Sequence, residues 1–279
     1  MVVSDEVIER LERLDIRFNE YGIDPLGISR EYLAHALSAI EFMHRRYFSA
    51  HAHGLEHIPD RGRAMLVGNH SGGVAVDGLT VLASVFFDKE PPRLVHGMAE
   101  KFLNNVPFVS QWLCRTGQFT GLPGTAERML EDERLLLVFP EGARGTAKLF
   151  RDRYSLVHFG TGFVRLALKM RAPIVPFAFL GGGEAVPTIF NLVRLGKLLG
   201  VPYIPLTPYL LPIPLPVRVD VYFGEPLVFQ GTGTEPDSVV AGYVDQVKER
   251  IAGLIAKGQE ERAALSWGRR SLSAGRKDR

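Results

Sequence analysis

Four short apolar runs, separated by stretches with helical periodicity, constrain the fold of this chain more than any other feature of its sequence. The runs read AMLVGN (64–69), RLLLVFP (134–140), APIVPFAFLG (172–181) and VRVDVYFGEP (217–226). The first three are continuously apolar, as expected for β-strands that are covered on both faces of a sheet. Residues 124–133 and 159–171 lie between the runs and have the spacing of amphipathic helices. Strands that alternate with helices predict an α/β fold with a mostly parallel central sheet flanked by helices.

Two amphipathic helices are predicted at the start of the chain. Ser4 is a good N-cap for a first helix that continues to Phe18, and Ser29 is a good N-cap for a second helix. We therefore expect a short N-terminal helical extension over residues 1–50 and an α/β domain over residues 51–260. The apolar stripe of each helix could lie on a bilayer surface, but packing against the protein is the commoner outcome for such patterns.

The charge of the chain is nearly balanced, with 33 Lys and Arg against 31 Asp and Glu, a net charge of +2. A protein that coats nucleic acid usually has a strong basic excess, so we expect no nucleic-acid partner. The basic excess is local, because residues 269–279 contain five Lys and Arg against Asp278. We expect a last helix over about residues 237–257 and then a basic flexible tail over residues 261–279. Attraction of this tail to anionic lipid is the alternative.

Cysteine and histidine usage gives no support for a metal site. The single cysteine, Cys114, excludes an internal disulfide and a multi-cysteine zinc site, and it fits a reducing compartment. His51, His53 and His57 have no standard metal-ligand spacing, so we expect a surface loop there and no bound metal.

Two segments bear on membrane insertion. The first residues of the chain are acidic and amphipathic, so we expect no signal peptide there. Residues 198–217 have no charge but contain six prolines. Each proline removes a backbone donor and would leave a carbonyl unpaired in hydrocarbon, so this segment is not expected to span a membrane as a helix.

Polar side chains follow two of the predicted strands directly. His70 and Asp77 come after the first apolar run, in VGNHSGGVAVDG, and Glu141 and Arg144 come after the second, in FPEGARGT. In parallel α/β sheets the loops at the carboxyl ends of the strands form the functional site. We therefore expect these two polar clusters to face one crevice.

The spacing of His70 and Asp77 sets a condition on the backbone between them. In a continuous helix the two side chains would lie about 10 Å apart along the axis, too far for a hydrogen bond. They can meet only if the segment starts as a loop and turns back, and Gly72 and Gly73 supply the necessary backbone freedom. If they meet, the aspartate fixes the imidazole tautomer and leaves the other ring nitrogen as a base. A polar turn without catalytic function is the alternative.

Three segments in this order resemble the glycerolipid acyltransferase family, which includes glycerol-3-phosphate and lysophosphatidate acyltransferases. They are GNHSGGVAVDG, LLLVFPEGARGT and APIVPFAF, and the resemblance covers residues 54–226, with FPEG-x-R as its most specific element. It implies transfer of a fatty acyl group from a thioester, acyl-CoA or acyl-ACP, to a hydroxyl of a lysophospholipid or related glycerolipid. It implies no bound cofactor, no metal and no covalent enzyme intermediate.

The resemblance also implies roles for individual residues. His70 would be the general base that takes the proton of the acceptor hydroxyl, and Asp77 would orient it. Glu141 and Gly142 would shape the acceptor pocket, and Arg144 would bind a phosphate, which suits the fixed fork of a guanidinium. The other predicted substrate-binding residues flank these motifs: Asn69, Ser71, Gly145, Thr146 and Lys148.

The sequence departs from the family pattern in two places. Six residues separate His70 from Asp77, where the family usually has four, and we interpret this as the longer NHSGG form of some bacterial members. In the middle block Thr120 and Gly121 stand near the point where phosphate-binding members have a basic residue, and Arg128 comes later. The possible substitutes are Arg115 and the basic cluster Lys148, Arg151 and Arg153.

The second departure keeps two other functions open. One is acylation of a neutral or amino-acid-containing lipid alcohol. The other is a catalytically inactive peripheral protein that keeps the fold for lipid binding.

The proline-rich segment allows two interpretations. Its apolar residues could be ordinary core, or they could form a surface that dips into a bilayer. The residues concerned are Tyr203, Leu206, Tyr209, Leu210 and Leu211. With the lipid chemistry that the resemblance implies, we expect a cytoplasmic protein, peripheral at the inner face of the membrane. Its expected partners are the acyl thioester, the lipid acceptor and the membrane surface, with acyl carrier protein as a further partner where acyl-ACP is the donor.

Overall fold

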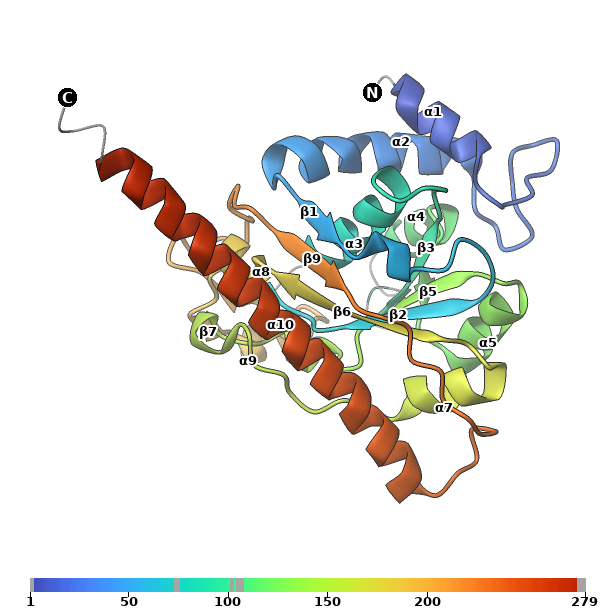
Figure 1. Cartoon of the computed structure of the whole chain (residues 1–279). Helices are drawn as coiled ribbons and strands as arrows, with labels where there is room; N and C mark the ends of the chain where they lie inside the picture. Colours follow the sequence, from blue (N-terminus) through green and yellow to red (C-terminus); the bar gives the residue numbers. More distant parts are fainter. Residues whose placement is uncertain (1–2, 73–75, 101–102, 104–107, 275–279) are drawn as a thin grey trace.

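The computed structural model describes residues 3–72, 76–100, 103 and 108–274, and over these it confirms a mostly parallel α/β fold (Figure 1). A seven-stranded sheet has the order β1-β9-β6-β2-β5-β3-β4, and its neighbouring strands pair in parallel except for β6 and β9. The strands are β1 (His51–His53), β2 (Ala64–Gly68), β3 (Val95–Ala99), β4 (Phe119–Thr120), β5 (Leu135–Val138), β6 (Ile174–Leu180) and β9 (Asp220–Phe223).

Helices cover both faces of this sheet. One face carries α1 (Asp5–Glu12), α2 (Arg30–Phe42) and α3 (Val76–Phe87), and the other carries α5 (Pro123–Glu131), α7 (Gly162–Met170) and α10 (Asp237–Ala274). Alternate residues of a strand point to opposite faces. Leu66 therefore packs in the core under α3, while its neighbour Met65 packs in the core under α5 and α7. Both faces being buried explains why the strand sequences are continuously apolar.

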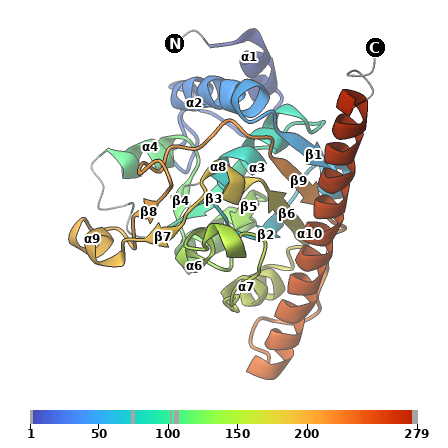
Figure 2. The same cartoon turned by 90° about the vertical axis from the view of Figure 1, so that its left-hand side faces the viewer.

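Shorter elements complete the chain. The helical ones are a π-helical turn (Met43–Tyr47) after α2, 3₁₀ turns at Leu55–His57 and Phe150–Asp152, α4 (Val109–Arg115), α6 (Ala143–Thr146), α8 (Gly182–Ala185) and α9 (Val193–Leu198). The strands β7 (Phe190–Asn191) and β8 (Pro205–Leu206) pair antiparallel outside the main sheet. Figure 2 shows this pair and α9 on the side of the molecule away from α10. None of the described helices is both long and apolar enough to cross a bilayer.

The N-terminal helices pack on the protein, which settles the choice left open by their apolar stripes. Val7 and Leu11 of α1 are buried in the same core cluster as α2 and α3. Helix α1 ends at Glu12, earlier than the predicted Phe18. The Asn19 side chain accepts hydrogen bonds from the backbone N–H groups of Tyr21 and Ile23. Such local side-chain bonds compete with helix formation, so the chain turns there instead.

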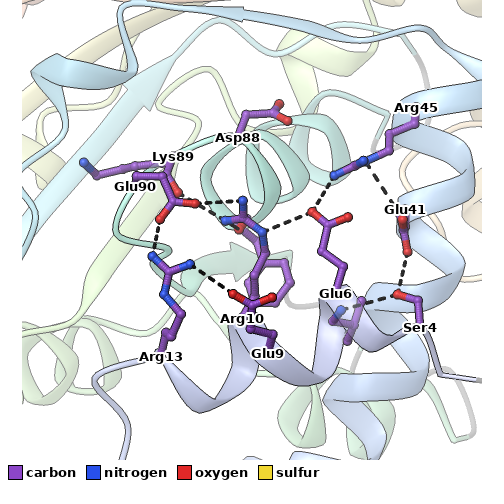
Figure 3. A network of polar contacts seen from close by, with 12 residues as sticks. Ser4, Glu6, Glu9, Arg10, Arg13, Glu41, Arg45, Asp88, Lys89 and Glu90 are labelled. Atoms are coloured by element: carbon purple, nitrogen blue, oxygen red, sulfur yellow. Dashed lines mark hydrogen bonds and ion pairs between the residues drawn. The ribbon is translucent and has the colours of Figure 1, made fainter.

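Polar contacts also fasten α1 to the domain (Figure 3). The Arg10 guanidinium donates to the carbonyl oxygens of Phe86 (3.0 Å) and Lys89 (3.3 Å), at the end of α3 and just beyond it. It also forms ion pairs with Glu6 and Glu90. One arginine therefore joins the extension to the chain that follows α3.

Helix α10 is longer than predicted and replaces most of the expected tail. It continues past residue 257 to Ala274, so residues 261–274 are helical and the prediction of a flexible tail over 261–279 is wrong for them. Residues 275–279 lie outside the described part of the chain. The sequence after residue 257 is rich in Ala, Glu and Arg, which are strong helix formers, and Gly258 does not end the helix.

That glycine, Gly258, lies where α10 crosses the sheet. A Cβ atom at this position would sit 2.7 Å from the Tyr222 ring and 2.9 Å from the Leu180 side chain. Just beyond it, Glu261 accepts a hydrogen bond from the Tyr222 hydroxyl (2.9 Å), and Arg262 donates to the Arg218 carbonyl oxygen (2.9 Å). The helix continues because it is held against the sheet on both sides of the close contact.

The structure also corrects the prediction of a surface loop at the histidine-rich segment. His51 and His53 belong to β1, which pairs with β9 at the edge of the sheet, instead of lying in a surface loop. The ring of His53 stacks on Tyr222, and His57 bonds the Phe223 carbonyl oxygen through Nδ1. These contacts are with the sheet, and no cluster of three or more His, Cys, Asp or Glu suited to a metal occurs among the residues described.

Candidate active site

The loop after β2 turns back and brings His70 against Asp77. Nδ1 of His70 lies 2.5 Å from an Asp77 carboxylate oxygen, although the two residues are seven positions apart. His70 is in the loop, whereas Asp77 lies in the first turn of α3. Gly72 has φ +94°, and a Cβ there would lie 2.9 Å from the Gly182 carbonyl oxygen. The predicted turn-back is therefore present, with Gly72 at its close contact; Gly73 falls outside the residues described.

The surroundings of Asp77 fix how the imidazole is held. The carboxylate is fully buried and also accepts hydrogen bonds from the backbone N–H groups of Ser71 (2.8 Å) and Gly78 (2.7 Å). A carboxylate with these donors calls for an N–H on Nδ1 of His70, which leaves Nε2 with a lone pair. Nε2 has no hydrogen-bond partner among the described residues, and the His70 side chain stays 14% exposed. This nitrogen can accept a proton from a molecule that enters from solvent.

An aromatic ring packs against the face of the His70 imidazole and fixes the plane of its ring. Phe139, which follows β5, stacks on His70 with ring centroids 4.0 Å apart and planes 12° from parallel. The edge of Phe139 meets Phe177 of β6. Gly145 approaches from α6, where a Cβ would lie 2.6 Å from the His70 Cβ. The histidine is therefore fixed by packing as well as by its hydrogen bond.

Glu141 connects the two motif loops. Its buried carboxylate accepts from the backbone N–H of His70 (2.8 Å) and the backbone N–H of Val157 (2.8 Å). It also forms an ion pair with Lys148 at 3.0 Å, in which the two side chains are 0% and 4% exposed. Lys148 in turn donates to the Ser155 carbonyl oxygen. Both charges lie behind the histidine loop, with their hydrogen-bonding atoms occupied by protein groups.

Asn69 has a similar internal position. Its side-chain amide donates to the Phe179 carbonyl oxygen (2.9 Å) and accepts from the Phe179 N–H (2.7 Å), and the residue is fully buried. These bonds extend the pairing of β2 with β6 by one residue beyond the last strand residue. Ser71, which follows His70, is also buried.

The residues of α6 are arranged around the mouth of the site. Arg144 is exposed and has no ion pair or hydrogen bond within the described parts of the chain. Gly142 precedes α6 with φ +56°, and the next N–H donates to Glu100. The Thr146 hydroxyl accepts from the hydroxyl of Tyr203, and burial raises the pKa of Tyr203 to about 12. Arg144 is thus free to meet an anion, while Thr146 links the site to the proline-rich segment.

The other basic residues considered for a phosphate lie elsewhere. Arg115 stacks over Tyr32 of α2, Arg153 pairs with Glu184, and Arg151 pairs with its neighbour. Arg128 is on α5, near the opposite edge of the sheet. The structure therefore brings together His70, Asp77 and Glu141, with Arg144 on the adjacent α6. Of the substitutes, only Lys148 joins them, through its ion pair with Glu141.

Phe139 and Tyr203 are the site residues that the sequence analysis missed. Phe139 could have been found from its place directly before the FPEG motif, since a residue next to a motif at a strand end commonly shares the site. No local signal points to Tyr203, because its partner Thr146 is 57 residues away. Burial raises the pKa of the Cys114 thiol.

Comparisons with known proteins give one family. The acyltransferase family model matches residues 49–180. An uncharacterized protein of Mycobacterium tuberculosis is 32% identical over 94% of this chain and 73% of its own length, and one of Mycobacterium leprae is 32% identical over 94% and 71%. The chloroplastic phytyl ester synthase 1 of Arabidopsis thaliana is 29% identical over 52% of this chain and 21% of its own.

Among solved structures, the fold is similar to the 1-acyl-sn-glycerophosphate (LPA) acyltransferase PlsC from Thermotoga maritima. The TM-score is 0.55 at 17% identity, covering 80% of this chain and 79% of the other. At this identity the similarity concerns the fold.

Proposed function

The chain belongs to the glycerolipid acyltransferase family, and we propose that it moves a fatty acyl group from acyl-CoA or acyl-ACP to a hydroxyl of a lysophospholipid or related glycerolipid. The observation that carries the proposal is the contact between His70 and Asp77, 2.5 Å apart, at the carboxyl end of β2. Arg144, whose guanidinium has no partner among the described residues, lies on α6, after the neighbouring strand β5. A base and an anion-binding group that follow neighbouring parallel strands suit attack by a phosphorylated alcohol.

The proposed reaction assigns the proton at each step. Nε2 of His70 takes the proton of the acceptor hydroxyl while the hydroxyl oxygen attacks the thioester carbonyl carbon. The new C–O bond forms, the C–S bond breaks, and the imidazolium returns the proton to the leaving sulfur. Asp77 stabilises the imidazolium between these two transfers.

The remaining predicted residues act by position. Glu141 and Lys148 hold the His70 backbone and the loop at Val157 at fixed positions, so we assign them a positioning role instead of contact with substrate. Asn69 has the same role through Phe179. Gly142, Gly145 and Thr146 carry the backbone past the imidazole, close enough to line an acceptor subsite.

The test is turnover with defined lipids. The protein is given a long-chain acyl-CoA and a set of lysophospholipids and neutral lipid alcohols, and free thiol is measured. Thiol release that depends on an acceptor supports the proposal. If the folded protein binds liposomes and no acceptor supports turnover, the chain is the inactive lipid-binding protein and the proposal is wrong.

A second candidate is acylation of a neutral lipid alcohol. It is supported by the similarity to an enzyme that is named for a phytyl ester, and by Thr120 and Gly121 in the middle block. Neutral acceptors that exceed phosphorylated ones in kcat/KM would favour it.

Replacement of Arg144 separates the two candidates. Arg144→Gln removes one charged hydrogen-bonding group, which is worth about 1.5–3 kcal/mol. We expect KM for a phosphorylated acceptor to rise about tenfold to a hundredfold, with little change for a neutral acceptor. Arg250→Gln, at an exposed and unpaired arginine of α10, is the control. An equal loss for both acceptor classes would remove the phosphate role.

Access to a lipid acceptor requires a membrane-facing surface, and exposed apolar side chains gather on one segment. We call this the α9 surface; its residues are Ile189, Phe190, Val193, Leu195, Leu198, Leu199, Leu210, Leu211, Ile213 and Leu215. Figure 2 shows α9 and the β7–β8 pair projecting beside α6. Arg194 and Lys197 of α9 are exposed and have no partner within the described chain. Apolar residues with unpaired cations suit an anionic bilayer, so we propose peripheral contact here, at the inner face of the membrane.

Only part of the predicted patch belongs to this surface. Leu210 and Leu211 are 71% and 57% exposed, while Tyr203 points its hydroxyl to Thr146 and is half-buried. The Tyr209 hydroxyl lies within hydrogen-bond distance of the carbonyl oxygens of Ile213 (2.8 Å), in the same segment, and Ala185 (3.5 Å), in α8. The tyrosines therefore connect the segment to the protein, and the leucines are free.

Polar replacement on α9 tests this contact. Leu198 and Leu199 are 81% and 63% exposed, so Leu198→Ser with Leu199→Ser leaves the core intact. Each buried leucine contributes about 1.5–3 kcal/mol, and we expect binding to phosphatidylglycerol vesicles to fall at least tenfold in a sedimentation assay. Val228→Ser, 67% exposed between β9 and α10, is the control. Wild-type binding by the double variant would place the membrane contact elsewhere.

A further inference from the structure

A polar cavity lies at the opposite edge of the sheet from His70. It has a volume of about 370 Å³ and is lined by residues just before β2, β3 and β5 and by the chain that follows α1. These are the amino ends of the strands, whereas His70 follows the carboxyl end of β2. A five-residue strand is about 16 Å long, so this cavity is separate from the candidate active site.

Arginines dominate the lining. The cavity is lined by Arg13, Arg17, Arg61, Arg93, Arg128 and Arg134, against the carboxylates of Asp15, Asp60, Asp132 and Glu133. Two of these carboxylates are already paired with cations outside the lining, Asp60 with Lys89 at 2.7 Å and Glu133 with Arg63. Arg13 is paired with Glu90, as Figure 3 shows, and Arg134 is paired through Nη2 with Asp24 at 3.0 Å.

Several of these cations form no ion pair with any described residue. Arg17, Arg61 and Arg128 are exposed and make no ion pair or side-chain hydrogen bond in the described ranges. Arg93 is buried and donates only to carbonyl oxygens, including those of Pro59 and Gly62. The cavity therefore holds an excess of positive charge that the described residues do not neutralise.

Two buried nitrogen atoms in the lining also lack a hydrogen-bond partner among the residues described. They are Nη1 of Arg134, a donor, and Nε2 of His96. His96 is 1% exposed, and its Nδ1 donates to the Gly117 carbonyl oxygen at 2.8 Å. Burial, together with the nearby charges of Arg134 and Arg93, lowers the pKa of His96 to about 3, so the ring is neutral. With the proton on Nδ1, Nε2 is an acceptor that needs a donor.

We propose that this cavity binds a phosphate-class anion that keeps one hydroxyl group. Its oxygen atoms would accept from Arg134 and from the unpaired arginines at the mouth, for which a guanidinium fork is well suited. Its hydroxyl would donate to Nε2 of His96. Buried polar atoms are normally satisfied, and this ligand satisfies both of the unpartnered atoms at once.

Two kinds of molecule could supply this phosphate group. One is free phosphate or a small soluble phosphate ester, and the other is the phosphate monoester headgroup of a lipid. Because Arg17 lies on the segment between the N-terminal helices α1 and α2, either ligand would bridge that segment to α5.

The experiment compares inorganic phosphate with sulfate by isothermal titration calorimetry on the full chain. At neutral pH the hydrogen phosphate ion keeps a hydroxyl, whereas sulfate has none. We expect phosphate to bind at least tenfold more tightly than sulfate. Arg17→Gln with Arg128→Gln should weaken phosphate binding at least tenfold, and both residues are exposed, so folding should be unaffected. Arg250→Gln on α10 is the matched control and should bind as the wild type does.

Each result of this experiment either supports the proposal or overturns it. Equal binding of phosphate and sulfate, or equal phosphate binding by the double variant and the wild type, would overturn the proposal. So would no phosphate binding at all, which would mean that water satisfies the two nitrogen atoms. Glycerol 3-phosphate and vesicles with or without phosphatidic acid then distinguish a soluble source from a lipid source. The readout is binding, so this test stands whether or not the acyl transfer proposal holds.

Discussion

His70→Ala is expected to lower kcat for acyl transfer by about 10²–10⁴-fold, which is the usual contribution of a positioned general base. The loss should fall on kcat more than on KM, because Nε2 acts on the hydroxyl proton in the transition state. Asp77→Asn should lose a comparable factor, since an amide at this position no longer enforces a proton on Nδ1 of His70. Acceptor-dependent thiol release, measured with saturating acyl-CoA, gives both values.

The control for this prediction is His35→Ala, at an exposed histidine of α2 whose ring bonds only a backbone carbonyl oxygen. It should keep full activity. Circular dichroism should show that each variant is folded, because the His70 side chain lies at the margin of the core and is partly exposed. Turnover by His70→Ala at the rate of the control would refute the assignment of the base.

The parts of the fold that could be predicted are those whose burial leaves a local pattern. Strands β2, β5 and β6 are covered on both faces and are continuously apolar, so their sequences identify them. Strands β1 and β3 were missed because HAH and VHGMA contain histidine and glycine in place of apolar residues. Their pairing depends on β9 and β5, which lie far away in the sequence.

The ends of the helices were the least predictable. Gly258 marks a close approach of α10 to Tyr222 instead of a helix end, and only the packed structure shows this. Helix α1 ends at Glu12, and the turn at Asn19 rests on side-chain bonds to two backbone groups, a local effect that apolar periodicity does not reveal.

The candidate site was predictable where side chains suited to catalysis directly follow the end of a strand. His70, Asp77, Glu141 and Arg144 follow two neighbouring parallel strands, and the general rule for such sheets brings them together. The positions of Glu141 and Lys148 as a buried pair could not be foreseen, because FPEGARGTAK does not show which charges face inward. Arg128, which comes after the middle block, lies on α5 at the opposite edge of the sheet.

The buried pair of Glu141 and Lys148 gives the largest expected effect on stability. Breaking a buried ion pair by removing one partner costs about 3–5 kcal/mol, because the other charge stays uncompensated. We expect Glu141→Gln and Lys148→Met each to lower the free energy of unfolding by this amount. The double variant should lose much less than the sum, since it leaves no lone charge. Urea unfolding measures all three, through midpoints at an unchanged m-value.

A surface pair of the same chemistry supplies the comparison. Lys169 and Glu127 lie 2.7 Å apart, but their side chains are 54% and 31% exposed. Glu127→Gln should therefore cost only about 0–1 kcal/mol. If Glu141→Gln costs no more than this, the carboxylate does not hold the two loops together, and its bond to the His70 N–H has no structural consequence. A second result concerns activity. If Glu141→Gln lowers stability as expected, and the fraction of the variant that is folded also has a lower kcat at an unchanged KM, then Glu141 positions His70 for catalysis as well.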